Sequence, residues 1–472
     1  MSDRRVFRWA TTSARLLAAT VASAVAVVAV VTAISIPWPT VTHEPVRVSA
    51  TPGPAATVIV CDGGLLTLGR DASAAGQLSA VTAQTVTGGV APGAPEPEES
   101  RLAMPALEGA EGPLVLTAQP QGRTRTDVAA SGSATVRAAD LAGFAASACR
   151  PPLMESWLVG GSAATGAADL VIVSNPGAVP ATVQLTVYGA DGAQTPPGGE
   201  NLIVAAGTQR VIPLAGLVLG EAAPVIRVSA VGAPVHASLQ ASITRVLTPG
   251  GVDQISAAAA PETSQTIAGV TVSAAPGAEG ASDAPAVVRV LSPAADATAT
   301  VTVTAIGTAL PVLTPEVVPL VAGQPTEVAL SGLPVGAYAV QVDADQPVVA
   351  AVWTTTGFGR GDDFAWYAAS PLITVPTLFA TSSGPLPALS LVNTAAEPVV
   401  VTVESNDELF SLEVTVPAAG STTVRLSPRT VYALESGGIG IRAALSFTGD
   451  GALAGFPIWP ADAATPPIVV YP

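Results

Sequence analysis

The apolar and polar positions divide this chain into one long uncharged run near the N-terminus and many short alternating runs after it. Residues 16–36, LLAATVASAVAVVAVVTAISI, are 21 residues without a charge. At 1.5 Å of rise per helical residue, such a run covers the roughly 30 Å hydrocarbon core of a bilayer. No second uncharged apolar run reaches 18 residues. The pattern therefore predicts a single membrane-spanning helix over residues 16–36.

The charges around this run set its predicted orientation. It is preceded by one acid, Asp3, and by four arginines, Arg4, Arg5, Arg8 and Arg15. Basic residues favour the cytoplasmic side, so we expect a cytoplasmic N-terminus and an extracytoplasmic bulk at the plasma membrane. A cleaved signal peptide is the alternative, disfavoured because the small-residue site Ala22-Ser23-Ala24 follows too few apolar residues. A twin-arginine export signal explains the arginines less simply than positive-inside charge does.

The sequence after the predicted span predicts a stalk followed by β-strands. Residues 37–55 carry five prolines and no periodicity, which is typical of an extended stalk. Beyond them, short runs rich in valine and threonine are separated by Gly, Pro, Asn and Asp, as in β-sandwiches. The stretch APGAPEPEES, residues 91–100, is expected to be a loop or a disordered insert.

Segments of the chain repeat one another in the same order. The echoes form three sets: 170–189, 287–307 and 389–405; then 205–217, 321–333 and 417–429; then 224–242 and 336–354, with 438–459 as a weaker copy. The glycines Gly207, Gly323 and Gly420 give periods of 116 and 97 residues. Such long periods, filled with alternating strands, indicate tandem sandwich domains rather than a solenoid of small repeats.

The predicted fold class is therefore all-β, with tandem immunoglobulin-like β-sandwich domains on a single N-terminal transmembrane helix. The expected division of the chain is a cytoplasmic tail (1–15), a transmembrane signal anchor (16–36), a Pro-rich stalk (37–55), a disulfide-closed β domain (56–155) and three β-sandwich repeats (156–262, 263–375 and 376–472).

Charge and cysteine content narrow the classes of function. Without residues 1–36, which carry four of the 19 basic and one of the 35 acidic residues, the formal charge falls from −16 to −19. Such a surface repels nucleic acid and anionic lipid headgroups. The only two cysteines, Cys61 and Cys149, lie on the predicted outside, where a disulfide is the usual state. We expect no metal site, because these thiols lack further ligands: the two histidines are His43, in the stalk, and His236, in a strand pattern.

Several stretches resemble a known family. They are WLVGGSAATGAADLVIVSNPGAVPATVQLTVYGADG (157–192), GVDQISAAAAP (251–261), GDDFAWYAASP (361–371) and the Cys61 segment VIVCDGG. Together they resemble an actinobacterial family of membrane-anchored extracytoplasmic proteins of unknown function, the domain of unknown function 5719 type. That family more often has a proline soon after the cysteine, where Asp62 and Gly63 stand here. The resemblance implies location and gross architecture, with genes often near a membrane glycosyltransferase. It implies no activity and no catalytic residues.

The sequence offers little catalytic chemistry. A Ser/His/Asp triad needs a base, and His236 in PVHASLQ is better explained as a structural strand histidine. The pairs Asp362/Asp363 and Asp343/Asp345 are better explained as solvated loop charges than as acid/base or calcium residues. Neither a phosphate-binding Gly-Lys-Ser/Thr loop nor a dinucleotide fingerprint occurs, so no cofactor is expected. We therefore expect no catalytic residues and a protein that is not an enzyme.

One cluster of aromatic residues stands out. WTTTGFGRGDDFAWY, residues 353–367, holds five of the chain's 19 aromatics. Trp353, Trp366 and Tyr367, with Asp362 and Asp363 beside them, could stack on and hydrogen-bond a sugar ring. The alternative, which the sequence favours, is that these rings fill a core or the junction between the second and third sandwich repeats. Exposure of Trp353 and Trp366 separates the two interpretations.

These observations favour a non-enzymatic scaffold or accessory protein of the cell envelope. A carbohydrate-binding extracytoplasmic module is the second expectation, and a hydrolase is a distant third. The expected partners are the membrane, crossed once, and an envelope protein or a glycan. Fold alone does not decide among these functions, because sandwiches host many unrelated ones.

Overall fold

The structure is a computed structural model that describes residues 3–35, 48–50, 54–70, 76–107, 110–122, 124–274, 286–461 and 468–470. The chain divides into two compact units, one of residues 1–52 with 467–472 and one of residues 53–466. Most of the predicted stalk, residues 37–55, including His43, lies outside the described residues.

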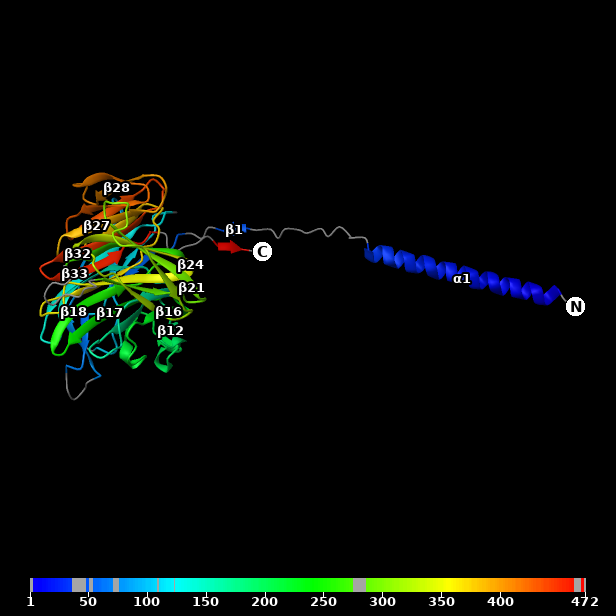
Figure 1. Cartoon of the computed structure of the whole chain (residues 1–472), viewed down its shortest axis with the longest axis horizontal. Coiled ribbons are helices and arrows are strands. Elements are labelled where there is room, and N and C mark those ends of the chain that lie inside the picture. The colour runs from blue at the N-terminus through cyan, green and yellow to red at the C-terminus, as the bar shows by residue number, and fades with distance from the viewer. Residues whose placement is uncertain are drawn as a thin grey trace. The chain divides into compact units, whose positions relative to one another are not determined.

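The first of these units contains the apolar helix. Helix α1 runs from Asp3 to Ser35, and its part from Thr12 to Ser35 is long and apolar enough to cross a membrane (Figure 1). A signal sequence would meet the same criterion. Hydroxyls within this part are satisfied inside the helix: Thr20 Oγ1 donates to the Leu16 carbonyl at 3.0 Å and Ser35 Oγ to the Val31 carbonyl at 2.5 Å. Such bonding suits a helix surrounded by hydrocarbon. Strand β1 (Val48–Ala50) pairs antiparallel with β34 (Ile468–Val470).

Residues 53–466 are built from β-strands that fall into four modules, which confirms the all-β class. The first module has two three-stranded sheets, ordered β2-β7-β6 and β5-β8-β9, and a hairpin β3-β4. Its strands are β2 (Thr57–Val60), β3 (Leu65–Leu68), β4 (Leu78–Thr82), β5 (Thr85–Val90), β6 (Glu98–Arg101), β7 (Leu114–Ala118), β8 (Val128–Arg137) and β9 (Ala142–Cys149). Part of the stretch 91–100, predicted to be a loop, thus forms β6.

The second module is a sandwich of two sheets. One has the order β10-β16-β12-β13, with β14 also on β12, and the other has the order β15-β11-β17-β18. Its strands are β10 (Glu155–Val159), β11 (Leu170–Asn175), β12 (Ala181–Gly189), β13 (Gly192–Gln194), β14 (Leu202–Val204), β15 (Thr208–Pro213), β16 (Val225–Val231), β17 (His236–Arg245) and β18 (Thr248–Ser256). In β12, buried and exposed residues alternate over ATVQLTV, as the period of a half-buried strand requires.

The third module joins its two sheets through one long strand. Its strands are β19 (Glu262–Val272), β20 (Ala286–Leu291), β21 (Ala297–Ala305), β22 (Glu316–Leu320), β23 (Thr326–Ala329), β24 (Gly336–Thr355) and β25 (Phe364–Ala368). The first half of β24 pairs with β19 and β21, and its second half pairs with β20 and β25. In the third module, β24 alone therefore forms the pairings with both sheets that β16 and β17 form in the second module.

The fourth module has two four-stranded sheets, ordered β26-β31-β28-β29 and β30-β27-β32-β33. Its strands are β26 (Thr377–Ala380), β27 (Pro387–Asn393), β28 (Val399–Ser405), β29 (Ser411–Val416), β30 (Gly420–Arg425), β31 (Val431–Glu435), β32 (Arg442–Gly449) and β33 (Ala452–Pro457). The sheet order of this module matches that of the second and third, so the three are copies of one topology.

The repeats seen in the sequence correspond to this topology. Residues 170–189, 287–307 and 389–405 form β11-β12, β20-β21 and β27-β28. At the end of β11, the Asn175 amide donates to the carbonyls of Val179 and Val204, and at the end of β27 the Asn393 amide donates to those of Glu397 and Pro417. The same side chain thus closes the same turn in two modules.

Two details of the predicted alignment are wrong. Residues 438–459 form β32 and β33, whereas the counterpart of β16 and β17 is β31 with β32, because β31 pairs with β28 as β16 pairs with β12. Residues 438–459 contain two consecutive strands joined by a short turn, as residues 224–242 do, which explains the error. The turn residue that matches Gly207 (φ 66°) and Gly323 (φ 76°) is Ala419 (φ 44°), one position before Gly420.

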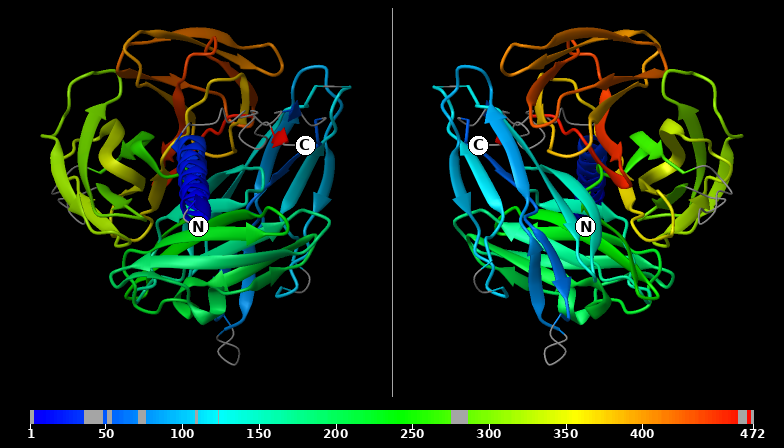
Figure 2. Two further views of the ribbon diagram at one scale, coloured as in Figure 1. Left: turned by 90° about the vertical axis from the view of Figure 1, so that its right-hand side faces the viewer. Right: turned by 90° about the vertical axis from the view of Figure 1, so that its left-hand side faces the viewer.

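The four modules close into a ring, an arrangement that the sequence did not predict. Strand β9 packs against β18 and β33, and β25 packs against the same two strands, so the last strand of each module lies at a common centre. Figure 2 shows the modules around this centre. The fourth module returns to the first, where Ser133 Oγ donates to the Ser383 carbonyl at 2.7 Å. The predicted tandem domains are therefore parts of one compact body.

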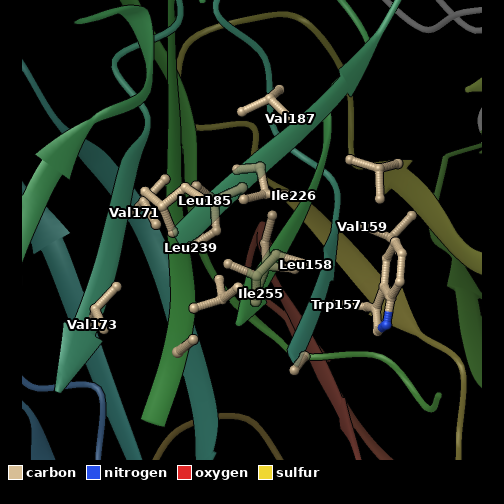
Figure 3. Close-up of a cluster of buried hydrophobic side chains, with 14 of the residues drawn as sticks. Trp157, Leu158, Val159, Val171, Val173, Leu185, Val187, Ile226, Leu239 and Ile255 are labelled. Atoms are coloured by element: carbon tan, nitrogen blue, oxygen red, sulfur yellow. The ribbon is translucent and has the colours of Figure 1, made fainter. Parts of the chain in front are cut away.

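The largest cluster of buried side chains belongs to the second module and extends into the third. Figure 3 shows Leu158, Leu185 and Ile226 from one sheet meeting Leu239 and Ile255 from the other. Six further members come from the third module: Leu291, Val349, Ala351, Phe364, Trp366 and Ala368. The core thus continues across the boundary between modules and holds them together.

Candidate functional site

The aromatic segment 353–367 forms the β24-β25 hairpin, at the place where the third module meets the second. Trp353 and Trp366 are opposite each other in the register of the two strands. Along β25, Phe364 and Trp366 belong to the core shared with the second module, whereas Ala365 and Tyr367 belong to the core of the third module. Strand β25 is therefore buried on both faces, which explains its run of apolar residues.

The residues predicted as glycan contacts lie in different environments. Trp366 is 5 % exposed and Tyr367 is 2 % exposed, so neither ring offers a face to the surface. Trp353 is partly buried, and Phe358, nearly parallel to it with ring centroids 6.5 Å apart, is exposed. The favoured interpretation placed these rings in a core or at the junction between the second and third sandwich repeats. Trp366 lies in a core, and that core is shared by the first and second repeats, which are the second and third modules.

The prediction that Asp363 is a solvated loop charge is wrong, because the residue is buried. Its side chain is 1 % exposed and lies at the centre of the ring. One carboxylate oxygen, Oδ1, accepts from the N–H groups of Val252 and Phe364, each at 3.1 Å. The other, Oδ2, accepts from the N–H groups of Phe144 at 2.8 Å and Leu453 at 3.4 Å. The four donors belong to β9, β18, β25 and β33, so one side chain binds all four modules.

The four donors occupy equivalent positions. Each follows the residue aligned with Asp363, which is Gly143 in the first module, Gly251 in the second and Ala452 in the fourth. A Cβ at Gly143 or Gly251 would lie 2.6 or 2.7 Å from Asp363 Oδ1, so glycine makes the room that the carboxylate needs. Burial raises the pKa of Asp363 to about 7, against the opposing effect of its four N–H donors.

Asp362, the neighbour of Asp363, points the other way and belongs to the surface loop. Its Oδ2 accepts from the Gly359 N–H at 2.5 Å, and Thr356 Oγ1 donates to its Oδ1 at 3.3 Å. The loop borders a hollow of about 760 Å³, and Asp363 is among the residues that line it. The β8-β9 and β32-β33 turns complete the wall of this hollow, with the charged residues Arg137, Arg425 and Asp450.

A second hollow, of about 260 Å³, lies on the other side of the same hairpin. Trp353, Trp366 and Phe364 line it together with Arg245 and Glu327. The Arg245 guanidinium lies over the Phe358 ring at 4.5 Å, and burial lowers the pKa of Arg245 although the charge of Asp362 opposes that change. This hollow combines aromatic walls with charged groups, and it is where the candidate Trp353 is accessible.

Sequence reasoning did not find a buried polar network between the first two modules. His236 lies in β17, as the strand pattern predicted, and its Nε2 is 2.6 Å from Asp62 Oδ1. Burial alone would raise the pKa of Asp62, but the hydrogen bond and charge of His236, with help from Ser147 and Ser238, lower it. The pair is closed off from solvent. The one sequence feature that could have indicated this pair is Asp62, an acidic residue directly after Cys61, in a place where the family more often has proline.

Other candidates from the sequence are located as follows. Cys61 and Cys149, the predicted pair, form a disulfide with a Cα–Cα distance of 4.0 Å. Asp343 and Asp345 are exposed, on strand β24 rather than in a loop. Within the described ranges, no group of three or more His, Cys, Asp or Glu side chains could hold a metal ion.

Comparison with known proteins gives one family match. A model described as a family of unknown function, DUF5719, matches residues 106–429. No curated protein matches the chain. The crystal structure of the FN1-FN3 domains of chicken CNTN1 is 12% identical and covers 68% of this chain and 100% of that chain, with a TM-score of 0.11. The BSP domain of a biofilm associated protein is 9% identical and covers 91% of this chain and 100% of its own, with a TM-score of 0.12.

Proposed function

The chain belongs to the DUF5719 family of unknown function, and from that premise we propose that it is a non-enzymatic scaffold or accessory protein of the cell envelope. The observation that carries the proposal is Asp363. Its buried carboxylate binds four backbone N–H groups of its own chain, one from each module. Its role is architectural, because it fixes the four modules in one rigid body.

Buried arginines support the same interpretation. Arg289 donates to the carbonyls of Gly161 and Pro224 in the second module, and Arg442 in the fourth donates to the carbonyl of Ser370 and to Glu262. Arg150 donates to the Ala257 carbonyl at 2.8 Å. These charged groups bridge modules, where a catalytic role would need access to a substrate. A rigid body of this kind suits the display of surfaces to partners.

The proposed location is the outer side of the plasma membrane, with α1 as an uncleaved anchor and the N-terminus in the cytoplasm. The apolar part of α1 and the disulfide support it, because disulfides persist in oxidising compartments. The protein is expected in the membrane fraction with an intact N-terminus, and external protease is expected to reach only residues beyond the span. Recovery of a soluble form that begins near residue 25 or 37 would contradict the anchor.

The function itself is tested by affinity capture of the full chain from solubilised membranes. A scaffold or accessory protein is expected to bring down the same envelope protein in repeated captures, and a membrane glycosyltransferase is the class to test first. The protein with α1 alone fused to a reporter is the control for non-specific membrane capture. Capture of no protein above this control would contradict the proposal.

Carbohydrate binding is the second candidate, and the hollow at Trp353 is the observation that favours it. An accessible indole beside Arg245 and Glu327 supplies a stacking face and hydrogen-bonding groups. If the hollow binds glycan, Trp353→Ala will abolish retention of the protein on cell-wall polysaccharide while circular dichroism stays unchanged. Leu409→Ala, which removes an exposed side chain of the fourth module, is the matched control. Equal retention of both variants would exclude this site.

A further inference from the structure

The first module differs from the other three at one edge of a sheet. In the second, third and fourth modules, the strands β11, β20 and β27 are each paired on both sides, with β15, β23 and β30 as the outer partners. The corresponding strand of the first module is β5, because it pairs with β8 as β11 pairs with β17. Among the described residues, no strand pairs with the outer edge of β5.

The length of one connection explains the difference. In the three complete modules, the outer strand comes from the segments 190–224, 306–335 and 406–430, between two strands of the other sheet. The first module has only residues 102–113 at this place. That connection instead reaches the second module, where the Ala103 N–H donates to the Gly207 carbonyl and the Gln209 N–H donates to the Ala103 carbonyl. The chain therefore leaves the outer position beside β5 unfilled in the part of the structure that is described.

The backbone groups at this edge point outward at alternate residues. The Ala91 N–H donates to Asp127 of the β8 side, so the odd-numbered residues of β5 face β8. Val86, Gly88 and Val90 consequently turn their N–H and C=O groups to the open edge. The Val90 carbonyl accepts from the Asn406 amide at 2.9 Å. Val86 and Gly88 have no hydrogen-bond partner on that side among the described residues.

A groove of about 810 Å³ runs along this edge. Val86, Gly88, Gly89 and Val90 form one side of it. The glycine pair leaves the strand without side chains at its middle, which allows another backbone to approach closely. Leu114 and Leu116 of β7 line the groove as well. The site thus offers main-chain hydrogen bonds and an apolar surface, the two features that β-strand addition uses.

The charge of the groove indicates the chemistry of its occupant. Three exposed glutamates line it, Glu96, Glu99 and Glu111, against one arginine, Arg101. Arg101 already lies 3.5 Å from Glu111 and donates to the Gly112 carbonyl. The net negative charge favours a basic segment.

We propose that the outer edge of β5 binds an extended, positively charged segment of a partner protein as an added antiparallel strand. The inference deepens the proposed scaffold function and rests on it, since it names the surface and the kind of partner. The direction follows from β15, β23 and β30, which are antiparallel to their neighbours.

The probe is a fluorescent peptide that copies residues 420–427, GSTTVRLS, the segment that fills the equivalent place in the fourth module. It is expected to bind the full chain in detergent, and the same peptide with glutamate in place of its arginine is expected to bind more weakly. Hydrogen exchange is expected to slow at the amides of residues 86, 88 and 90 on binding, while residues 87 and 89 keep the protection that β8 already gives them.

Two substitutions isolate the backbone contact. Val86→Pro removes the outward N–H, whereas Val86→Ala removes most of the same side chain and keeps that N–H. Loss of one hydrogen bond and exclusion by the proline ring are expected to weaken peptide binding roughly tenfold in Val86→Pro relative to Val86→Ala. Circular dichroism checks that both variants fold.

Three outcomes would overturn the proposal: no binding of the peptide, equal binding by the two variants, or strong protection of the amides of residues 86 and 88 in the free protein. The last measurement uses the unchanged protein, so it decides even if Val86→Pro does not fold. If affinity capture recovers a partner equally well with Val86→Pro and Val86→Ala, the result supports the scaffold function but contradicts the proposed binding site at β5.

Discussion

At the scale of single residues, Asp363 shows how one side chain can hold a repeat protein closed. A buried carboxylate is costly unless it is hydrogen-bonded, and here four backbone N–H groups supply the bonds. The donors come from all four modules, so loss of this one acceptor affects every module at once. The stability of the ring therefore depends on this residue more than on an average buried one.

Asp363→Ala is expected to destabilise the protein by at least about 4 kcal/mol, because it leaves four buried donors unsatisfied at about 1–3 kcal/mol each. Urea unfolding followed by tryptophan fluorescence measures the loss. The neighbouring Asp362→Asn is the control, since Asp362 bonds only within its own loop, and we expect a change within about 1 kcal/mol. Equal effects of the two substitutions would contradict the central role of Asp363.

The pKa of Asp363 leads to a prediction about pH. Burial raises it to about 7 from 3.8, so the folded state binds the proton more tightly than the unfolded state does. The resulting stability is fully present below 3.8 and is lost as the pH rises through 7, by up to about 4 kcal/mol. The urea midpoint is expected to fall between pH 5 and pH 8. Asp363→Asn, which does not titrate, should show a smaller fall; an unchanged pH dependence would refute the assignment.

At the scale of strands and links, the disulfide ties the end of β9 at the ring centre to the residue that follows β2. Its cysteines are 88 positions apart, which corresponds to about 4 kcal/mol in the chain-entropy model. Replacement of both, Cys61→Ser with Cys149→Ser, is expected to lower the free energy of unfolding by about that amount. A reducing agent should have the same effect on the unchanged protein and none on the variant. If reduction leaves the unfolding midpoint of the unchanged protein where it was, the link is not structural.

Strands and their order could be predicted where the pattern was local. The alternation in ATVQLTV and its echoes indicated strands, and the offsets between Gly207, Gly323 and Gly420 indicated the period. The alignment failed at 438–459, because the β32-β33 hairpin is also two short strands joined by a turn and periodicity alone cannot give pairing partners.

Because a sequence pattern does not show which distant segments meet, the surroundings of Asp363 were missed. Packing of Trp366 and Tyr367 was the favoured interpretation, and both side chains are buried in the structure. The burial of Asp363 was not predictable, because its donors Phe144, Val252 and Leu453 come from other modules far along the chain. An acid in a glycine-rich turn ordinarily lies in solvent.

At the scale of the molecule, the tandem arrangement expected from the repeats becomes a closed ring. Each junction carries its own ties, such as His236 to Asp62 between the first two modules and Arg442 to Glu262 between the last two. Ring closure needs contact between the first and fourth modules, which are the farthest apart in sequence. Repeat periods carry no information about that contact, because each repeat could bury its own core without it.

The contact between Ser133 and Ser383 tests ring closure most directly. Their Oγ atoms are 2.8 Å apart although 250 residues separate them along the chain. In the double variant Ser133→Cys with Ser383→Cys, mild oxidation of the folded monomer is expected to form an intramolecular disulfide, which peptide mapping by mass spectrometry will detect. The two single variants control for exchange with the native Cys61–Cys149 pair. Free thiols at both positions, or links between molecules only, would show that the modules do not close into a ring.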